Sequence, residues 1–173
     1  MSFEAFEGTI VSPDLLQVAR HWRAACGSRR MPAWRDIRPS AISAQLPIVW
    51  SYKFDAASNA FTGRLAGDKI EAMFDESFRG TAMEKLFPAH EYQRALTRHK
   101  RVLAEPAFFH GKGLVFAHLN RHGTGERIIL PLAEDGEHGD GIVGATKYYM
   151  ATGEPPGELS RGGEREEWFP LSS

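Results

Sequence analysis

The chain has 173 residues, of which 42% are hydrophobic and 11 are phenylalanine, so it is long enough for one domain with its own core. Its formal net charge of -1 gives no overall attraction to DNA or to an anionic membrane, so neither partner is expected. A single cysteine excludes an intramolecular disulfide framework and four-cysteine zinc sites. The acidic N-terminus and the lack of an apolar run near ~20 residues predict a cytoplasmic protein without a membrane span.

Residues 12–27 read as an amphipathic helix with both ends marked by Ser12, Pro13 and Gly27. Its apolar residues follow 4-3-4 spacing and form one stripe, which consists of Leu15, Ala19, Trp22 and Cys26. This stripe must be covered either by its own domain or by a second copy of the chain. The second alternative makes these four residues candidates for a homodimer interface.

A connector broken by prolines follows, and we assign residues 1–45 to the N-terminal helix and this connector. Six arginines lie between residues 20 and 38. A solvated surface is the simplest interpretation of this cluster. Binding to an anionic surface, or to the acidic segment near the C-terminus, is the alternative.

The next segment predicts a hairpin and three helices. Residues 47–54 alternate apolar and polar side chains and are expected to pair with residues 61–67, where Phe61 and Leu65 share one face. Two clipped helices are expected near residues 68–75 and 82–87. A longer helix opens at Pro88, and its stripe consists of Tyr92, Leu96, His99 and Leu103.

Three further strands, at residues 113–121, 126–134 and 141–150, are separated by glycine-rich turns. The whole pattern predicts an α+β fold over residues 46–150, with a five-stranded antiparallel sheet, short helices on one face and the N-terminal helix on the other. Pro131 implies a bulge or an edge position, because proline cannot donate to a central ladder. Residues 151–173 have the composition of a flexible tail, although the bulky residues 168–171 leave docking open.

This order of elements is similar to the PAS family, and within it to the bacterial single-domain type that begins with a helix and a proline-rich connector. The resemblance rests on WRAACGSRRMPAWRDIRPSAISAQLP before the first strand and FTGRLAGDKIEAMFDESFRGTAMEKLF after it. It implies a cavity between the sheet and the short helices. Gly67 would form the strand-to-helix corner, Asp68 the N-cap, and Arg79-Gly80 the turn between the clipped helices. No chemistry follows from the family alone.

The resemblance implies a sensory or protein-interaction module without catalytic activity, which signals through other proteins or a homodimer. A small apolar ligand with one or two hydrogen-bonding groups would suit the cavity. The candidate lining residues are Leu65, Ile70, Met73, Phe74, Leu86, Tyr92, Leu96, His99, Phe116, His118 and Tyr148. In the alternative interpretation, the same residues fill one another's space and the core is solid.

No motif implies a cofactor or a metal. The spacing of His110, His118 and His122 matches no familiar metal site. Heme and flavin are not expected, since His99 and His118 read as core histidines and Cys26 lies outside the pocket helices, where flavin photochemistry would need it. The alternative function is a small cone-fold lyase or isomerase that uses a cavity His or Asp, with His99 or His118 as the available base.

Overall fold

The computed structural model describes residues 2–118, 120–158 and 163–172, without the side chain of His118. Its centre is an antiparallel sheet with the order β2-β1-β5-β4-β3-β6. The strands are β1 (Val49–Asp55), β2 (Ala60–Ala66), β3 (Ala107–His118), β4 (Arg121–Leu132), β5 (Gly141–Thr152) and β6 (Glu164–Pro170). The expected α+β class is confirmed, but the described sheet has six strands rather than five.

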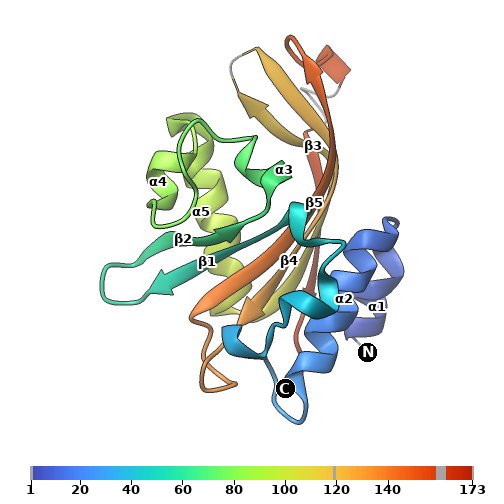
Figure 1. The fold of residues 1–173 in the computed structure, drawn as a ribbon, viewed down its shortest axis with the longest axis vertical. Coiled ribbons are helices and arrows are strands. Elements are labelled where there is room, and N and C mark those ends of the chain that lie inside the picture. The colour runs from blue at the N-terminus through green and yellow to red at the C-terminus, as the bar shows by residue number, and fades with distance from the viewer. Residues whose placement is uncertain (1, 119, 159–162, 173) are drawn as a thin grey trace.

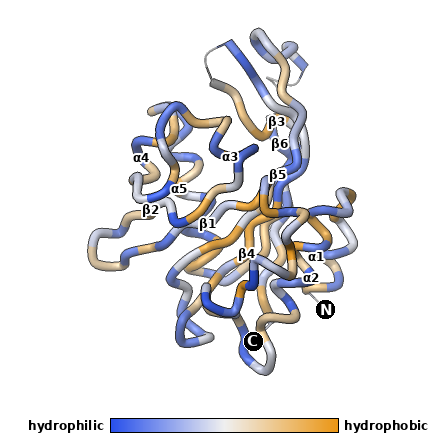
Figure 2. Tube along the Cα trace, viewed as in Figure 1, coloured by the Kyte–Doolittle hydropathy of each residue, from blue (hydrophilic) through white to orange (hydrophobic). Residues whose placement is uncertain are grey.

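Helices cover both faces of the sheet (Figure 1). On one face lie α1 (Ser2–Thr9) and α2 (Pro13–Cys26), and on the other lie α3 (Asp68–Glu71), α4 (Met83–Leu86) and α5 (Ala89–Ala104). Three short 3-10 helices, Trp34–Asp36, Pro39–Ile42 and Leu46–Ile48, form the connector. Figure 2 shows the hydrophobic residues concentrated where the helices meet the sheet. None of the described helices is long and apolar enough to cross a membrane.

The stripe of α2 is covered by the sheet of its own chain. Its four predicted residues are 0–2% exposed and belong to the core cluster between α2 and the sheet. Trp22 Nε1 donates to the Pro131 carbonyl at 2.8 Å, and its ring meets Phe108 edge-on at 5.0 Å. The stripe is therefore covered by its own domain and not by a second copy of the chain, and these residues are not available as a homodimer interface.

Pro131 lies within β4 without a bulge at that position. The pairing of β4 with β3 ends at Ile129, so Pro131 needs no donor toward β3. This position is locally an edge of the sheet, as the sequence indicated.

The C-terminal segment corrects the expectation of a flexible tail. Residues 164–170 form β6, which pairs with the free edge of β3. Trp168 packs edge-on against Phe109 at 5.0 Å, and Arg101 lies 4.0 Å from the Trp168 ring centre. The composition of the whole tail hid this strand, because the ordering contacts come from a distant strand edge and helix.

The two short helices lie where they were expected but are shorter than predicted, with four residues each. Gly67, rather than Asp68, is the N-cap residue of α3, so Asp68 is already inside the helix. Gly80 has φ +80° and turns the chain before α4, and the Glu71 carboxylate accepts a hydrogen bond from Phe78 N between the two helices. We refer to residues 68–104 as the helical wall.

Candidate functional site

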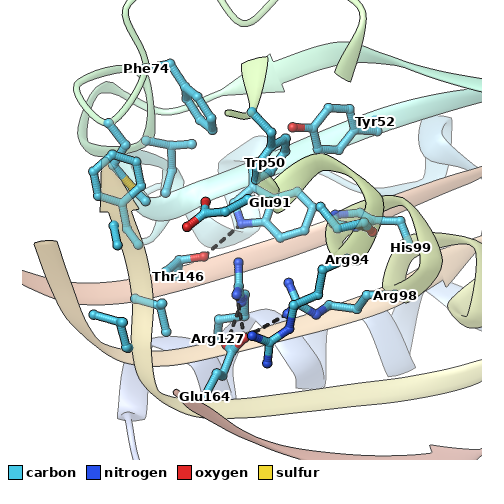
Figure 3. Close-up of a pocket in the computed structure, with 18 of the residues that line it drawn as sticks. Trp50, Tyr52, Phe74, Glu91, Arg94, Arg98, His99, Arg127, Thr146 and Glu164 are labelled. Carbon is cyan, nitrogen blue, oxygen red and sulfur yellow. Dashed lines mark hydrogen bonds and ion pairs between the residues drawn. The ribbon is translucent and has the colours of Figure 1, made fainter. Parts of the chain in front are cut away.

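A cavity of about 170 Å³ lies between the helical wall and the sheet (Figure 3). An apolar cavity of about 150 Å³ is large enough for one benzene molecule. Most of the lining is apolar and comes from β1, the helical wall and residues 114–117 of β3. These lining residues are Trp50, Tyr52, Ile70, Met73, Phe74, Phe78, Phe87 and Leu114 to Ala117.

Two aromatic residues of β1 form the apolar end of the pocket. Trp50 is held in orientation because its Nε1 donates to Thr146 Oγ1 at 2.9 Å. Tyr52 packs against Phe78 with 4.7 Å between ring centres. The Tyr52 hydroxyl is buried and has no hydrogen-bond partner among the described residues. Burial raises the pKa of Tyr52, so this hydroxyl is a neutral donor.

Charged side chains from three separate elements meet at the other end of the pocket (Figure 3). Glu164 of β6 lies between Arg127 of β4 and Arg98 of α5. Its carboxylate accepts two parallel hydrogen bonds from Arg127, at 2.7 Å from Nε and 2.5 Å from Nη2. The nearest Arg98 nitrogen is 3.2 Å away. Two parallel bonds of this kind are among the stronger charge-assisted contacts in proteins.

The charges at this end stabilise one another. Burial, the largest single effect, acts to raise the pKa of Glu164, but the charge and hydrogen bonds of Arg127 together with the charge of Arg98 outweigh it and the pKa is lowered. Burial likewise acts to lower the pKa of Arg127, but the charge and hydrogen bonds of Glu164 together with the charge of Glu166 outweigh it and the pKa is raised. Burial, followed by the Arg127 charge, lowers the pKa of Arg98 to about 10. All three groups are therefore charged at neutral pH.

Arg98 spans the buried and the exposed part of this charged end. Its side chain is 7% exposed, and its Nε has no hydrogen-bond partner among the described residues. Its Nη2 donates to Glu166 at 3.0 Å, and Glu166 also contacts Arg94 at 3.5 Å. Because the Arg94 side chain is 60% exposed, it marks the solvent side of the pocket.

His99 lines the pocket but is poorly suited to proton transfer. It is 1% exposed, and its Nδ1 is within hydrogen-bonding distance of the Ala95 carbonyl. Burial lowers the pKa of His99 to about 3, so the ring is neutral. Its ring packs among those of Trp50, Tyr52 and Phe61. A general base at neutral pH needs a pKa near that pH.

A family model described as PAS domain matches residues 10–147. The chain belongs to the PAS domain family. Comparisons with curated proteins and with solved structures gave no significant match. The match includes α2, the connector and the helical wall of this PAS domain, and it ends before β6.

Five of the predicted residues line the pocket of this PAS domain, namely Ile70, Met73, Phe74, His99 and Phe116. Four others do not line the cavity: Leu86 belongs to the surrounding core, and Tyr92, Leu96 and Tyr148 are partly buried and pack against it. The Tyr148 hydroxyl donates to the Lys69 carbonyl and so ties β5 to α3. His118 ends β3, and its side chain lies outside the described part of the chain.

Leu65 lies on the opposite face of the sheet, where it packs against the core beneath α2. Its predicted place was wrong because the pairing of β1 with β2 shifts register next to Arg64. One extra residue in a strand reverses the face of every residue beyond it. Phe61 therefore points into the core on the pocket side, while Leu65 does not.

The charged residues of the pocket were not among the predicted ones. Arg127 has the same strand parity as Ile129, so the alternation along β4 does place it on the pocket side. Arg98 and Glu164 gave no such signal, since one precedes an expected core histidine and the other lies in the segment that reads as flexible. Among the described residues, no group of three His, Cys, Asp or Glu side chains is placed to hold a metal ion.

Proposed function

We propose that this PAS domain is a non-catalytic sensory module, which binds a small, mainly apolar ligand in the pocket and signals through a partner protein or a second copy. Membership of a family of sensory and interaction modules supports the general role. The observation that carries the ligand is the pocket itself. Its aromatic lining includes two buried polar atoms without a partner among the described residues, Tyr52 Oη and Arg98 Nε. Buried polar groups are nearly always hydrogen-bonded in native proteins, so two in one lining favour an occupant that bonds them.

The helical wall supports a response to occupancy. The helices α3 and α4 contain four residues each, so few internal hydrogen bonds hold them in place. Segments of this kind open locally at a lower free energy than a long helix or a central strand. A ligand in the pocket contacts Ile70 and Phe74 directly, and we expect its binding to shift the population of wall conformations.

The signal would leave by a surface other than the stripe of α2, which is covered by the sheet. For the lyase or isomerase alternative, the low pKa of His99 gives no support. The pocket volume also favours a ligand of about one ring, because pockets that hold larger molecules usually have volumes of about 300–1,000 Å³.

The test is a thermal-shift screen of ring-sized compounds, with toluene, phenol and phenylacetate as probes, together with native mass spectrometry of freshly purified protein. A compound that binds the folded state raises the unfolding temperature. The variant Ala95→Leu fills the cavity from α5, because Ala95 is buried and lines the pocket. We expect it to weaken probe binding at least about tenfold.

The matched control is Ala104→Leu, which makes the same change at an exposed position of the same helix. It should leave probe binding unchanged, and urea unfolding of both variants verifies that they are folded. Equal binding by Ala95→Leu, Ala104→Leu and the unmodified protein would contradict the assignment of the pocket.

A further inference from the structure

The carboxylate at the arginine end of the pocket belongs to the last strand of the sheet. Glu164 is the first residue of β6, and its side chain is 2% exposed between Arg127 and Arg98. In the described sheet, β6 is an edge strand that pairs only with β3. The charged end of the pocket is therefore completed by a segment with a single neighbouring strand.

The place of this carboxylate is shaped by a glycine of the neighbouring strand. A Cβ atom at Gly111 would lie 2.3 Å from Glu164 Oε2, well inside van der Waals contact. Any other residue at position 111 would displace the carboxylate from Arg127. The guanidinium groups of Arg98 and Arg127, together with the space left by the glycine at position 111, thus form a site of carboxylate size. This site opens onto the aromatic part of the pocket (Figure 3).

We propose that the ligand is a small aromatic carboxylate, whose ring fills the apolar end of the pocket and whose carboxylate replaces that of Glu164 at Arg98 and Arg127. This inference rests on the proposed function of the pocket as a ligand site. The replacement frees residues 164 and 165 from β3, and this local release of the strand transmits ligand binding to the protein surface.

The exchange keeps the buried charges balanced. One anion leaves the two arginines as another arrives, so neither guanidinium is left buried without a counter-ion, which would be strongly destabilising. The departing Glu164 regains its hydration in water. The ring of the ligand adds burial against residues such as Trp50 and Phe78, which Glu164 does not provide.

The release is confined to the start of β6. Farther along the strand, Trp168 stays packed against Phe109 and beneath Arg101. The Leu171 amide donates to the Pro106 carbonyl at 2.7 Å and anchors the far end. The strand therefore opens from residue 164 and remains held from residue 168 onward.

The experiment compares phenylacetate with its neutral isostere phenylacetamide by isothermal titration calorimetry on the full chain. The unmodified protein should prefer phenylacetate. The variant Glu164→Gln removes the competing charge with little change of shape, and it should bind phenylacetate at least about tenfold more tightly. The matched control Glu167→Gln removes the same charge from β6 at a residue that lies 3.6 Å from His110 and is not part of the pocket lining. It should leave the affinity for phenylacetate unchanged.

Hydrogen exchange on the unmodified protein tests the release without any variant. Saturating phenylacetate should accelerate exchange of the amides at residues 164 and 165 and leave those near residue 168 slow. Equal binding of the two probes, with no gain in Glu164→Gln, would overturn the inference and leave the ligand pocket intact. Tight binding of phenylacetate without faster exchange would also overturn it. Failure of both probes and of every compound in the thermal-shift screen would refute the pocket function as well.

Discussion

Replacing Glu126 by glutamine should loosen the N-terminal helices from the sheet. Glu126 lies in β4 and is 5% exposed. Its carboxylate accepts hydrogen bonds from the amide of Val11 at 2.8 Å and from that of Ser12 at 2.7 Å, at the start of α2. It also accepts one from His110 Nε2 at 2.7 Å. One buried carboxylate therefore binds the two backbone donors that precede α2.

The expected loss follows from counting acceptors. Glutamine has one acceptor oxygen, and its NH₂ group cannot accept from a backbone amide. At least one of the two amides loses its bond to a charged acceptor, which is worth about 1.5–3 kcal/mol. A buried donor left without a partner adds about 1–3 kcal/mol, and the two estimates overlap in part. We expect Glu126→Gln to lower the free energy of unfolding by about 2–4 kcal/mol.

Urea unfolding followed by circular dichroism measures this loss. Glu134→Gln is the matched control, because Glu134 makes its ion pair with Arg35 at the surface, where the two side chains are 60% and 64% exposed. Such pairs contribute about 0–1 kcal/mol, so the control should stay close to the unmodified protein. If Glu126→Gln unfolds at the same urea concentration as Glu134→Gln, Glu126 does not hold α2 in place.

Three further outcomes are expected. The pKa values of Glu126 and Glu164 are both lowered from 4.5, because burial is outweighed by the hydrogen bonds to Glu126 taken together and by the combined charge and hydrogen bonds of the arginines beside Glu164. The stability that these carboxylates contribute is therefore complete above the unfolded pKa and lost as pH falls through the folded pKa. In urea unfolding, Glu126→Gln should lower the free energy of unfolding less at about pH 3 than at about pH 6. Burial raises the pKa of Cys26 to about 11, so iodoacetamide should modify the native thiol at least about 100-fold more slowly than the unfolded one, and equal rates would contradict its burial. A Cβ at position 144 would lie 2.3 Å from the Trp50 ring, so Gly144→Ala should lower stability by about 1–3 kcal/mol and weaken probe binding, whereas Gly8→Ala, which meets nothing within 4 Å, should do neither.

The fold could be predicted from the sequence where the signals are local. Ser12 and Pro13 mark the start of α2, and Gly80 turns the chain between the clipped helices as expected. The strands β3 and β4 are longer than predicted, and in β4 the reason is that the HGTG segment inside it read as a turn. Gly111 lies in the part of β3 that precedes the predicted strand, where it pairs with both β4 and β6.

The elements that the sequence missed depend on distant contacts. The N-terminal helix α1 is ordered by packing, with Phe6 stacked on Phe108 at 4.8 Å. The pocket was predicted only in its apolar part for the same reason. A search for apolar stripes selects Leu96 and Tyr92, whereas Arg98 and Ala95 are the more buried residues of α5. Arg98 is buried because acidic residues of β6 meet it, and no local pattern around Arg98 indicates them.

The position of α2 also has a consequence for how the protein behaves on dilution. Because α2 and the helical wall cover the two faces of the sheet within one chain, neither apolar face of the sheet, as far as the structure describes it, needs a second copy in order to fold. Obligate dimers unfold at a midpoint that rises with protein concentration. This chain should unfold at the same urea concentration whether it is dilute or concentrated, so its abundance in a cell can fall without loss of the folded state.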